Sequence, residues 1–129
     1  MTVQRVISPI DGAVVAERPV ATPDQVEAVL RRADAARAAW AATPLVERAA
    51  RVELAVQYML DHADEVGLEM TVQMGRPVGQ SPNEIRRGFQ ERARMMASLA
   101  PAALADLPAS DKAGFTRFIR REPVGTVLV

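Results

Sequence analysis

Apolar residues recur every three or four positions through most of the chain, which is the period of an amphipathic helix. The first such stretch follows the segment TPDQ at 22–25, which has the form of a capping box with proline at the first helical position. The pattern predicts a helix from Pro23, with one apolar face made by Val26, Val29, Leu30, Ala33 and Trp40.

The second periodic stretch predicts one long helix, from about Pro44 to Met74. Gly75 is expected to end that helix, and Pro77 prevents its continuation. Its apolar residues step by threes and fours through Ala49, Val52, Val56, Met59, Leu60, Ala63, Val66 and Met70.

The third stretch begins at SPNE, residues 81–84, which has the form of a second capping box. Pro101 is expected to kink or end this helix, because proline lacks a backbone donor and clashes with the preceding turn. The apolar stripe consists of Ile85, Phe89, Ala93, Met96 and Ala100.

The two ends of the chain predict strands. Val3–Ile7 and Ala13–Val20 are rich in β-branched residues around a turn, which indicates a hairpin. Leu107–Gly114 is the expected loop, and Phe115–Arg121 has two mixed faces, as in an edge or arm strand. Thr126–Val129 is continuously apolar and predicts the start of a strand buried on both faces. The residues therefore predict a mainly helical α+β chain.

Composition excludes several classes of protein. The 129 residues suit a single domain, and 16 basic against 16 acidic residues argue against a general binder of nucleic acid or of a membrane surface. Without cysteine, these residues contain no disulfide, thiolate metal site or cysteine nucleophile. No signal peptide or membrane-spanning run is present, so a cytoplasmic location is expected.

The residues alone name no reaction. His62, the single histidine, lies between Asp61 and Ala63 and is expected on the solvated face, and no metal-ligand spacing surrounds it. The segment GRPVG at 75–79 lacks the glycines and lysine of a nucleotide-binding loop. The arginines at positions 117, 120 and 121 fit a solvated strand edge better than an anion site.

The order of the segments says more than any one of them. The series ISPIDGAVVAERPVA, ARAAWAATPLVERAA, MTVQMGRPVG and FIRREPVGTVLV resembles the N-terminal part of the aldehyde dehydrogenase superfamily, from about Ile7 to Val129. Two positions depart from the family pattern. Gln73-Met74 replaces the usual acid–threonine pair, and Leu128 stands where many members have a small residue.

The resemblance implies an α/β parent fold with a Rossmann-like sheet, and residues 1–129 as the N-terminal part of its cofactor-binding domain. It implies an oxidoreductase that converts an aldehyde into a carboxylic acid with NAD or NADP, through a cysteine nucleophile, a glutamate base and an oxyanion-holding asparagine. The resemblance places these groups and the cofactor loop after Val129, beginning with a P-W-N motif. No catalytic or cofactor-binding residue is therefore assigned here, and the chain alone is expected to be inactive and to bind no cofactor.

The resemblance also implies two roles for segments that are present. Residues 115–122 correspond to an arm strand through which family members form oligomers, so a homo-oligomer is expected. The third helix corresponds to one that lines the substrate entrance in many members. Its candidate lining residues are Phe89, Arg92, Met95 and Met96.

Two other hypotheses remain open. The chain is either a non-catalytic remnant or small interaction module that pairs through open strand edges, or an unrelated helical binding module. An uncovered strand at 126–129 and uncovered helix faces would leave little stability in isolation. We therefore expect the isolated chain to be poorly folded or oligomeric.

Overall fold

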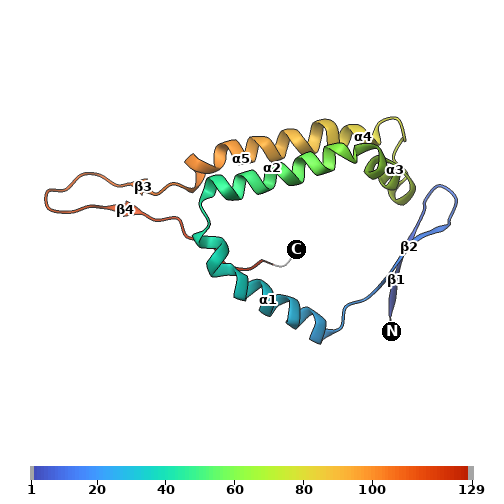
Figure 1. Ribbon diagram of the computed structural model, residues 1–129, viewed down its shortest axis with the longest axis horizontal. Helices are drawn as coiled ribbons and strands as arrows, with labels where there is room; N and C mark the ends of the chain where they lie inside the picture. The colour runs from blue at the N-terminus through green and yellow to red at the C-terminus, as the bar shows by residue number, and fades with distance from the viewer. Residues whose placement is uncertain (1, 128–129) are drawn as a thin grey trace.

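In the computed structural model, which describes residues 2–127, a layer of helices stands between two β-hairpins (Figure 1). Helices α2 and α5 run side by side in opposite directions, and α3 and α4 lie at one end of that pair (Figure 1). The elements in chain order are β1 Val3–Ile7, β2 Val14–Pro19, α1 Pro23–Ala42, α2 Leu45–Asp61, α3 Ala63–Met74, α4 Ser81–Asn83, the π-helical η1 Glu84–Phe89, α5 Gln90–Leu104, β3 Leu107–Pro108 and β4 Phe118–Ile119.

The N-terminal hairpin is confirmed. Strands β1 and β2 pair antiparallel, with Val3 opposite Pro19 and Val6 opposite Ala16. The turn between them is closed by Ser8, which is 3% exposed. Its amide donates to the Ala13 carbonyl at 2.8 Å, and its side-chain oxygen accepts from the Ile10 amide at 3.2 Å. A serine in such a turn supplies bonds that strand pairing leaves unmade.

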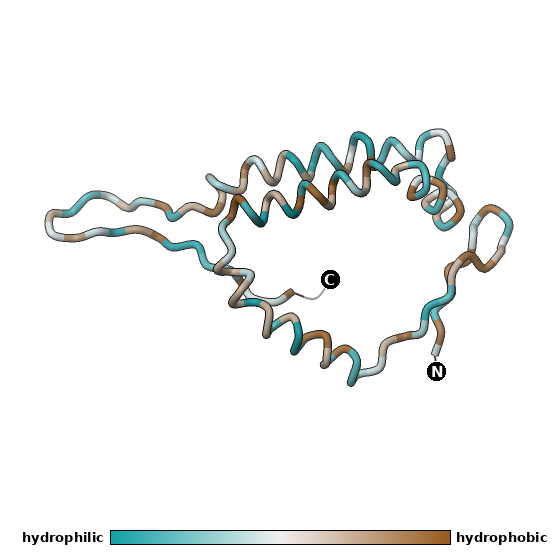
Figure 2. Tube along the Cα trace, in the orientation of Figure 1, coloured by the Kyte–Doolittle hydropathy of each residue, from teal (hydrophilic) through white to brown (hydrophobic). Residues whose placement is uncertain are grey.

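Helix α1 begins at the predicted capping box. The Thr22 hydroxyl accepts from the Gln25 amide at 3.3 Å, and the Gln25 side chain accepts from the Thr22 amide at 2.9 Å. The predicted apolar face forms, but no residue of α1 is buried, and Val29 and Trp40 are each 47% exposed. Figure 2 shows apolar residues along α1 and the first hairpin, outside the layer of α2 and α5.

The predicted continuous helix from Pro44 to Met74 is wrong. Helix α2 ends at Asp61, and α3 starts at Ala63. His62 lies between them with a φ of −106°, its ring nitrogen Nδ1 is 2.8 Å from the Tyr58 carbonyl oxygen, and its ring stacks on Tyr58 at 4.2 Å. The expected fully solvated position is corrected to a half-buried one at a helix junction. The apolar period runs through this break, which is why the sequence pattern did not reveal it.

The second predicted capping box is also wrong. Ser81 is fully buried inside α4, where it donates to the Pro77 carbonyl at 3.1 Å and shares a hydrogen bond with the Thr71 hydroxyl at 2.9 Å. A buried hydroxyl needs such partners, and these come from Thr71 near the end of α3 and from Pro77 in the loop that follows it. Gly75 ends α3 as predicted, in the left-handed conformation with a φ of +73°.

The core is small and lies where α2, α3 and η1 meet. Its buried apolar residues are Val56 and Ala63, each 1% exposed, and Ile85, 5% exposed. Gly67 of α3 lies against Pro82 of α4, since a Cβ built on Gly67 would be 2.7 Å from the Pro82 backbone nitrogen. Glycine therefore permits the close approach of these two helices.

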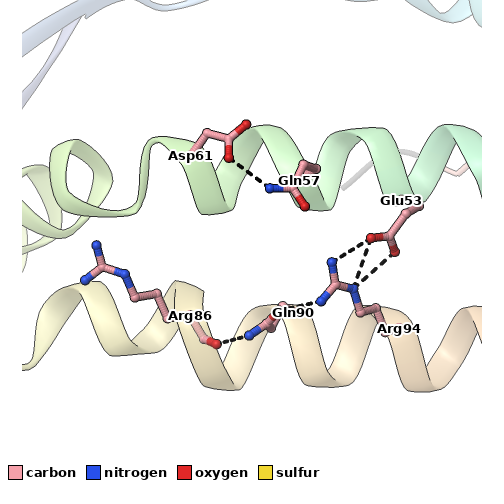
Figure 3. Close-up of polar contacts among 6 residues, drawn as sticks. All are labelled: Glu53, Gln57, Asp61, Arg86, Gln90 and Arg94. Atoms are coloured by element: carbon pink, nitrogen blue, oxygen red, sulfur yellow. Dashed lines mark hydrogen bonds and ion pairs between the residues drawn. The ribbon is translucent and has the colours of Figure 1, made fainter.

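A pair of charged side chains joins α2 to α5 (Figure 3). Arg94 contacts both oxygens of the Glu53 carboxylate, with its Nη2 2.6 Å from Oε1 and its Nε 3.2 Å from Oε2. Gln90 accepts a further bond from Arg94 at 2.6 Å. Bidentate geometry of this kind fixes position along the helix as well as distance.

Helix α5 continues past Pro101 to Leu104, so the proline does not end it. The predicted strand Phe115–Arg121 is regular only at Phe118–Ile119, and the expected loop Leu107–Gly114 supplies its partner strand β3. The two strands form an antiparallel hairpin that extends away from the helices (Figure 1). Residues 126–127 are not in a strand, and Leu128–Val129 of the predicted buried strand lie outside the described residues.

The contact between α3 and α4 predicts the effect of adding one methyl group. We expect Gly67→Ala to lower the free energy of unfolding by about 1–3 kcal/mol, because the new Cβ meets backbone that cannot move aside easily. Gly79→Ala is the matched control, since nothing lies within 4 Å of its Cβ position. Urea unfolding followed by circular dichroism measures both. Equal midpoints for the two variants would contradict the close packing.

The Glu53–Arg94 pair predicts a dependence of stability on pH. Hydrogen bonds from Arg94 are the main reason that the pKa of Glu53 lies below its ordinary value of 4.5; partial desolvation opposes them, and the charge of Arg94 adds to them. A carboxyl with a lowered pKa stabilises the fold above its ordinary pKa and loses that contribution as the pH falls through the lowered value.

Melting temperatures of the wild type and Glu53→Gln between pH 7 and pH 3 test this expectation. We expect the variant to be less stable at pH 7 and the difference to shrink as the pH falls below about 4.5. Glu47→Gln, at an exposed glutamate in the first turn of α2, is the control. A gap between wild type and Glu53→Gln that stays constant down to pH 3 would exclude the proposed contribution.

Candidate substrate-entrance helix

Three of the four candidate entrance residues lie together. Arg92, Met95 and Met96 are exposed on α5 and line a shallow hollow of about 280 Å³ with Glu91. Phe89, at the end of η1, is half-buried and does not line this hollow. The helical period brings positions 92, 95 and 96 onto one side of α5.

A larger groove of about 430 Å³ lies on the neighbouring side of α5. Met96 borders both the hollow and the groove. Arg48 brings the single charged group, and its Nε atom is buried without a hydrogen-bond partner within residues 2–127. The groove is lined by Trp40, Leu45, Arg48, Ala49, Val52, Ala93, Met96, Ala97 and Ala100. Such an apolar lining suits an apolar occupant.

The hollow is lined by one acidic residue, Glu91, and one basic residue, Arg92, and Arg92 is held by Glu84. Arg92 Nη2 lies 3.0 Å from Glu84 Oε1, and Arg76 Nη2 lies 3.2 Å from Glu84 Oε2. The hydrogen bond from Arg92, then that from Arg76, and then the charge of Arg76 lower the pKa of Glu84, so the carboxylate stays ionised at neutral pH. Sequence reasoning missed this role, because Glu84 occupies the last position of the expected capping box.

The segment η1–α5 is also tied to α3. Arg86 Nη2 lies 2.6 Å from Asp64 Oδ2 in the first turn of α3. With the Glu53–Arg94 pair, which Figure 3 shows, this contact holds the candidate helix at two points eight residues apart. The position of Arg92, Met95 and Met96 thus depends on contacts to both α2 and α3.

The other candidate groups have structural partners. Arg117 donates to the Ser110 carbonyl and hydroxyl, and Arg120 pairs with Asp106 at 3.5 Å. Arg121 donates to the Ala103 carbonyl. These contacts favour the solvated hairpin over an anion site. Among residues 2–127, no three His, Asp or Glu side chains gather as metal ligands, and none of the described helices combines the length and apolarity needed to cross a membrane.

Known proteins with similar sequences and structures identify the family to which this chain belongs. A malonate-semialdehyde dehydrogenase of Bacillus pumilus is 27% identical over 125 residues, which are 96% of this chain and 25% of the relative. The structure of an NAD-dependent benzaldehyde dehydrogenase from Corynebacterium glutamicum matches with a TM-score of 0.76 and 26% identity, over 88% of this chain and 24% of that one.

A third match supports the fold alone. PnpE, solved in complex with nicotinamide adenine dinucleotide, gives a TM-score of 0.81 at 22% identity, over 95% of this chain and 25% of that one. The predicted α/β parent fold is confirmed by these structures, and the chain spans about a quarter of the length of the relatives it matches. The sequence profile of the aldehyde dehydrogenase family matches residues 2–129, and the chain belongs to that family.

Proposed function

We propose that this chain is the N-terminal part of the cofactor-binding domain of an NAD- or NADP-dependent aldehyde dehydrogenase, which oxidises an aldehyde to a carboxylic acid. The single observation that carries the proposal is the family match over residues 2–129. The NAD-dependent relative of known structure supports a nicotinamide cofactor. The cysteine, the glutamate base and the cofactor loop would be supplied by polypeptide beyond these residues.

The part of this chain in the reaction is to form one wall of the substrate entrance. Arg92, Met95 and Met96 give that wall two flexible apolar side chains and one cation. Methionine adapts to aldehydes of different shape, whereas an arginine distinguishes charged from neutral ones. The names of the relatives cover both kinds, since malonate semialdehyde carries a carboxylate and benzaldehyde is neutral.

The proposal is tested on the complete gene product that contains this chain. We expect it to reduce NAD or NADP when an aldehyde is added, as measured by the absorbance of the reduced nicotinamide. The chain of 129 residues alone is the control and should reduce neither, because it contains no cysteine nucleophile. Absence of reduction with malonate semialdehyde, succinate semialdehyde and benzaldehyde, with both cofactors, would favour the interaction-module hypothesis instead.

We further propose that the β3–β4 hairpin, whose second strand lies in the predicted arm 115–122, joins subunits of a homo-oligomer. Phe118 and Ile119 are 44% and 63% exposed, and a two-stranded hairpin has open edges that accept another strand. We expect Ile119→Asp to reduce the mass of the complete protein in light scattering, whereas Ala113→Asp, in the turn at the tip, should not. An unchanged mass in both variants would argue against the arm.

A further inference from the structure

The segment η1 changes which side chains share a face. In an ideal α-helix, eight residues cover slightly more than two turns, so positions 84 and 92 would be offset by about 80°. A π-helix closes i→i+5 bonds and holds more residues in each turn, which reduces this offset. Glu84 and Arg92 therefore lie on nearly the same face, and their side chains meet at 3.0 Å. π-Helical turns are rare and often occur at functional sites.

Gly88 leaves the space in which this pair forms. A Cβ at Gly88 would lie 3.2 Å from Arg92 Nη2 and 3.2 Å from Glu84 Oε1. Both distances are tighter than ordinary van der Waals contact, so a larger residue would require the carboxylate or the guanidinium to shift by a few tenths of an ångström. The ion pair thus lies directly over the backbone of η1, and its geometry depends on the residue there.

The cluster is short of negative charge. One carboxylate, Glu84, faces two guanidinium groups, Arg76 and Arg92, so the three groups together carry one positive charge. Arg92 is the most exposed of the three, with 69% of its side chain accessible against 38% for Arg76 and 35% for Glu84. Because a guanidinium has five N–H donors, Arg92 can bind a second anion while it keeps one bond to Glu84.

From this geometry we propose that Glu84 determines how strongly the entrance discriminates between carboxylated and neutral aldehydes. Glu84 competes with the carboxylate of the substrate for Arg92, and it adds to Glu91 in weakening the attraction that Arg92 offers at the hollow it shares with Glu91, Met95 and Met96. This inference rests on the proposed function. It concerns the charge of the aldehyde, not its oxidation, so Glu84 is a positioning residue and not a catalytic one.

The experiment compares two substrates in the complete enzyme, an aldehyde with a terminal carboxylate and an uncharged aldehyde of the same chain length. Glu84→Gln should raise the ratio of their kcat/KM values by about two- to fivefold, the size typical of one exposed charge interaction. The change should lie in the KM of the carboxylated aldehyde, with kcat nearly unchanged, and it should shrink in high salt. Glu84→Asp should give a ratio closer to the wild type.

Two other variants keep the result decisive. Arg92→Met should lower the ratio and should cancel the effect of Glu84→Gln in the double variant. Glu27→Gln makes the same chemical change at another Arg-paired glutamate, on α1 and away from the entrance helix, and should leave the ratio unchanged. If Glu84→Gln does not fold, Glu84→Asp takes its place, because the shorter side chain also weakens the bond to Arg92 and should raise the ratio by a smaller amount.

Failure of this inference is distinct from failure of the proposed function. A wild-type enzyme that oxidises neither aldehyde overturns both. An active enzyme in which Glu84→Gln and Arg92→Met leave the ratio unchanged, or in which Glu27→Gln shifts it equally, overturns only the role of Glu84.

Discussion

The close approach of α3 and α4 at Gly67 and Pro82 is the contact on which the rest of the helical layer depends. A side chain at position 67 would meet the backbone of Pro82, so the two helices can lie this near only with glycine there. The same approach buries Ser81 against Thr71 and Pro77. Because this contact fixes the position of α4, it also fixes where η1 begins. The direction of α5, which continues η1, follows from that starting point.

Charged pairs then set the register of α5. Arg86 reaches Asp64 on α3 and Arg94 reaches Glu53 on α2, so the helix is held on two sides. Exposed pairs of this kind contribute little to stability individually. Their effect is geometric, because a bidentate contact is lost when the helix slides by one residue. The small core of Val56, Ala63 and Ile85 contains no residue of α5, so the register of this helix depends more on the pairs.

The sequence predicted the elements whose signals are local. Thr22 and Gln25 form the expected cap, Gly75 ends its helix in the left-handed conformation, and the first hairpin turns at Ser8. It failed where the decisive partner is distant in the chain. Ser81 has the same local pattern as Thr22, but Thr71 and Pro77 occupy its hydroxyl, and Glu84 is drawn to Arg76 and Arg92. A local sequence pattern does not determine which of several possible partners a polar side chain bonds.

At the candidate entrance, too, some features follow from the local sequence and others from contacts that the local sequence does not reveal. Helical period accounts for the position of Arg92, Met95 and Met96 on one side of α5, where they line the hollow. The ion pairing of Arg92 does not follow from the helical period. It depends on Glu84, on the space above Gly88 and on the π-helical turn that brings positions 84 and 92 together. Nothing in the periodicity of the sequence signals that turn. The charge that an aldehyde would meet at this surface is therefore set by backbone geometry as much as by the residues that line it.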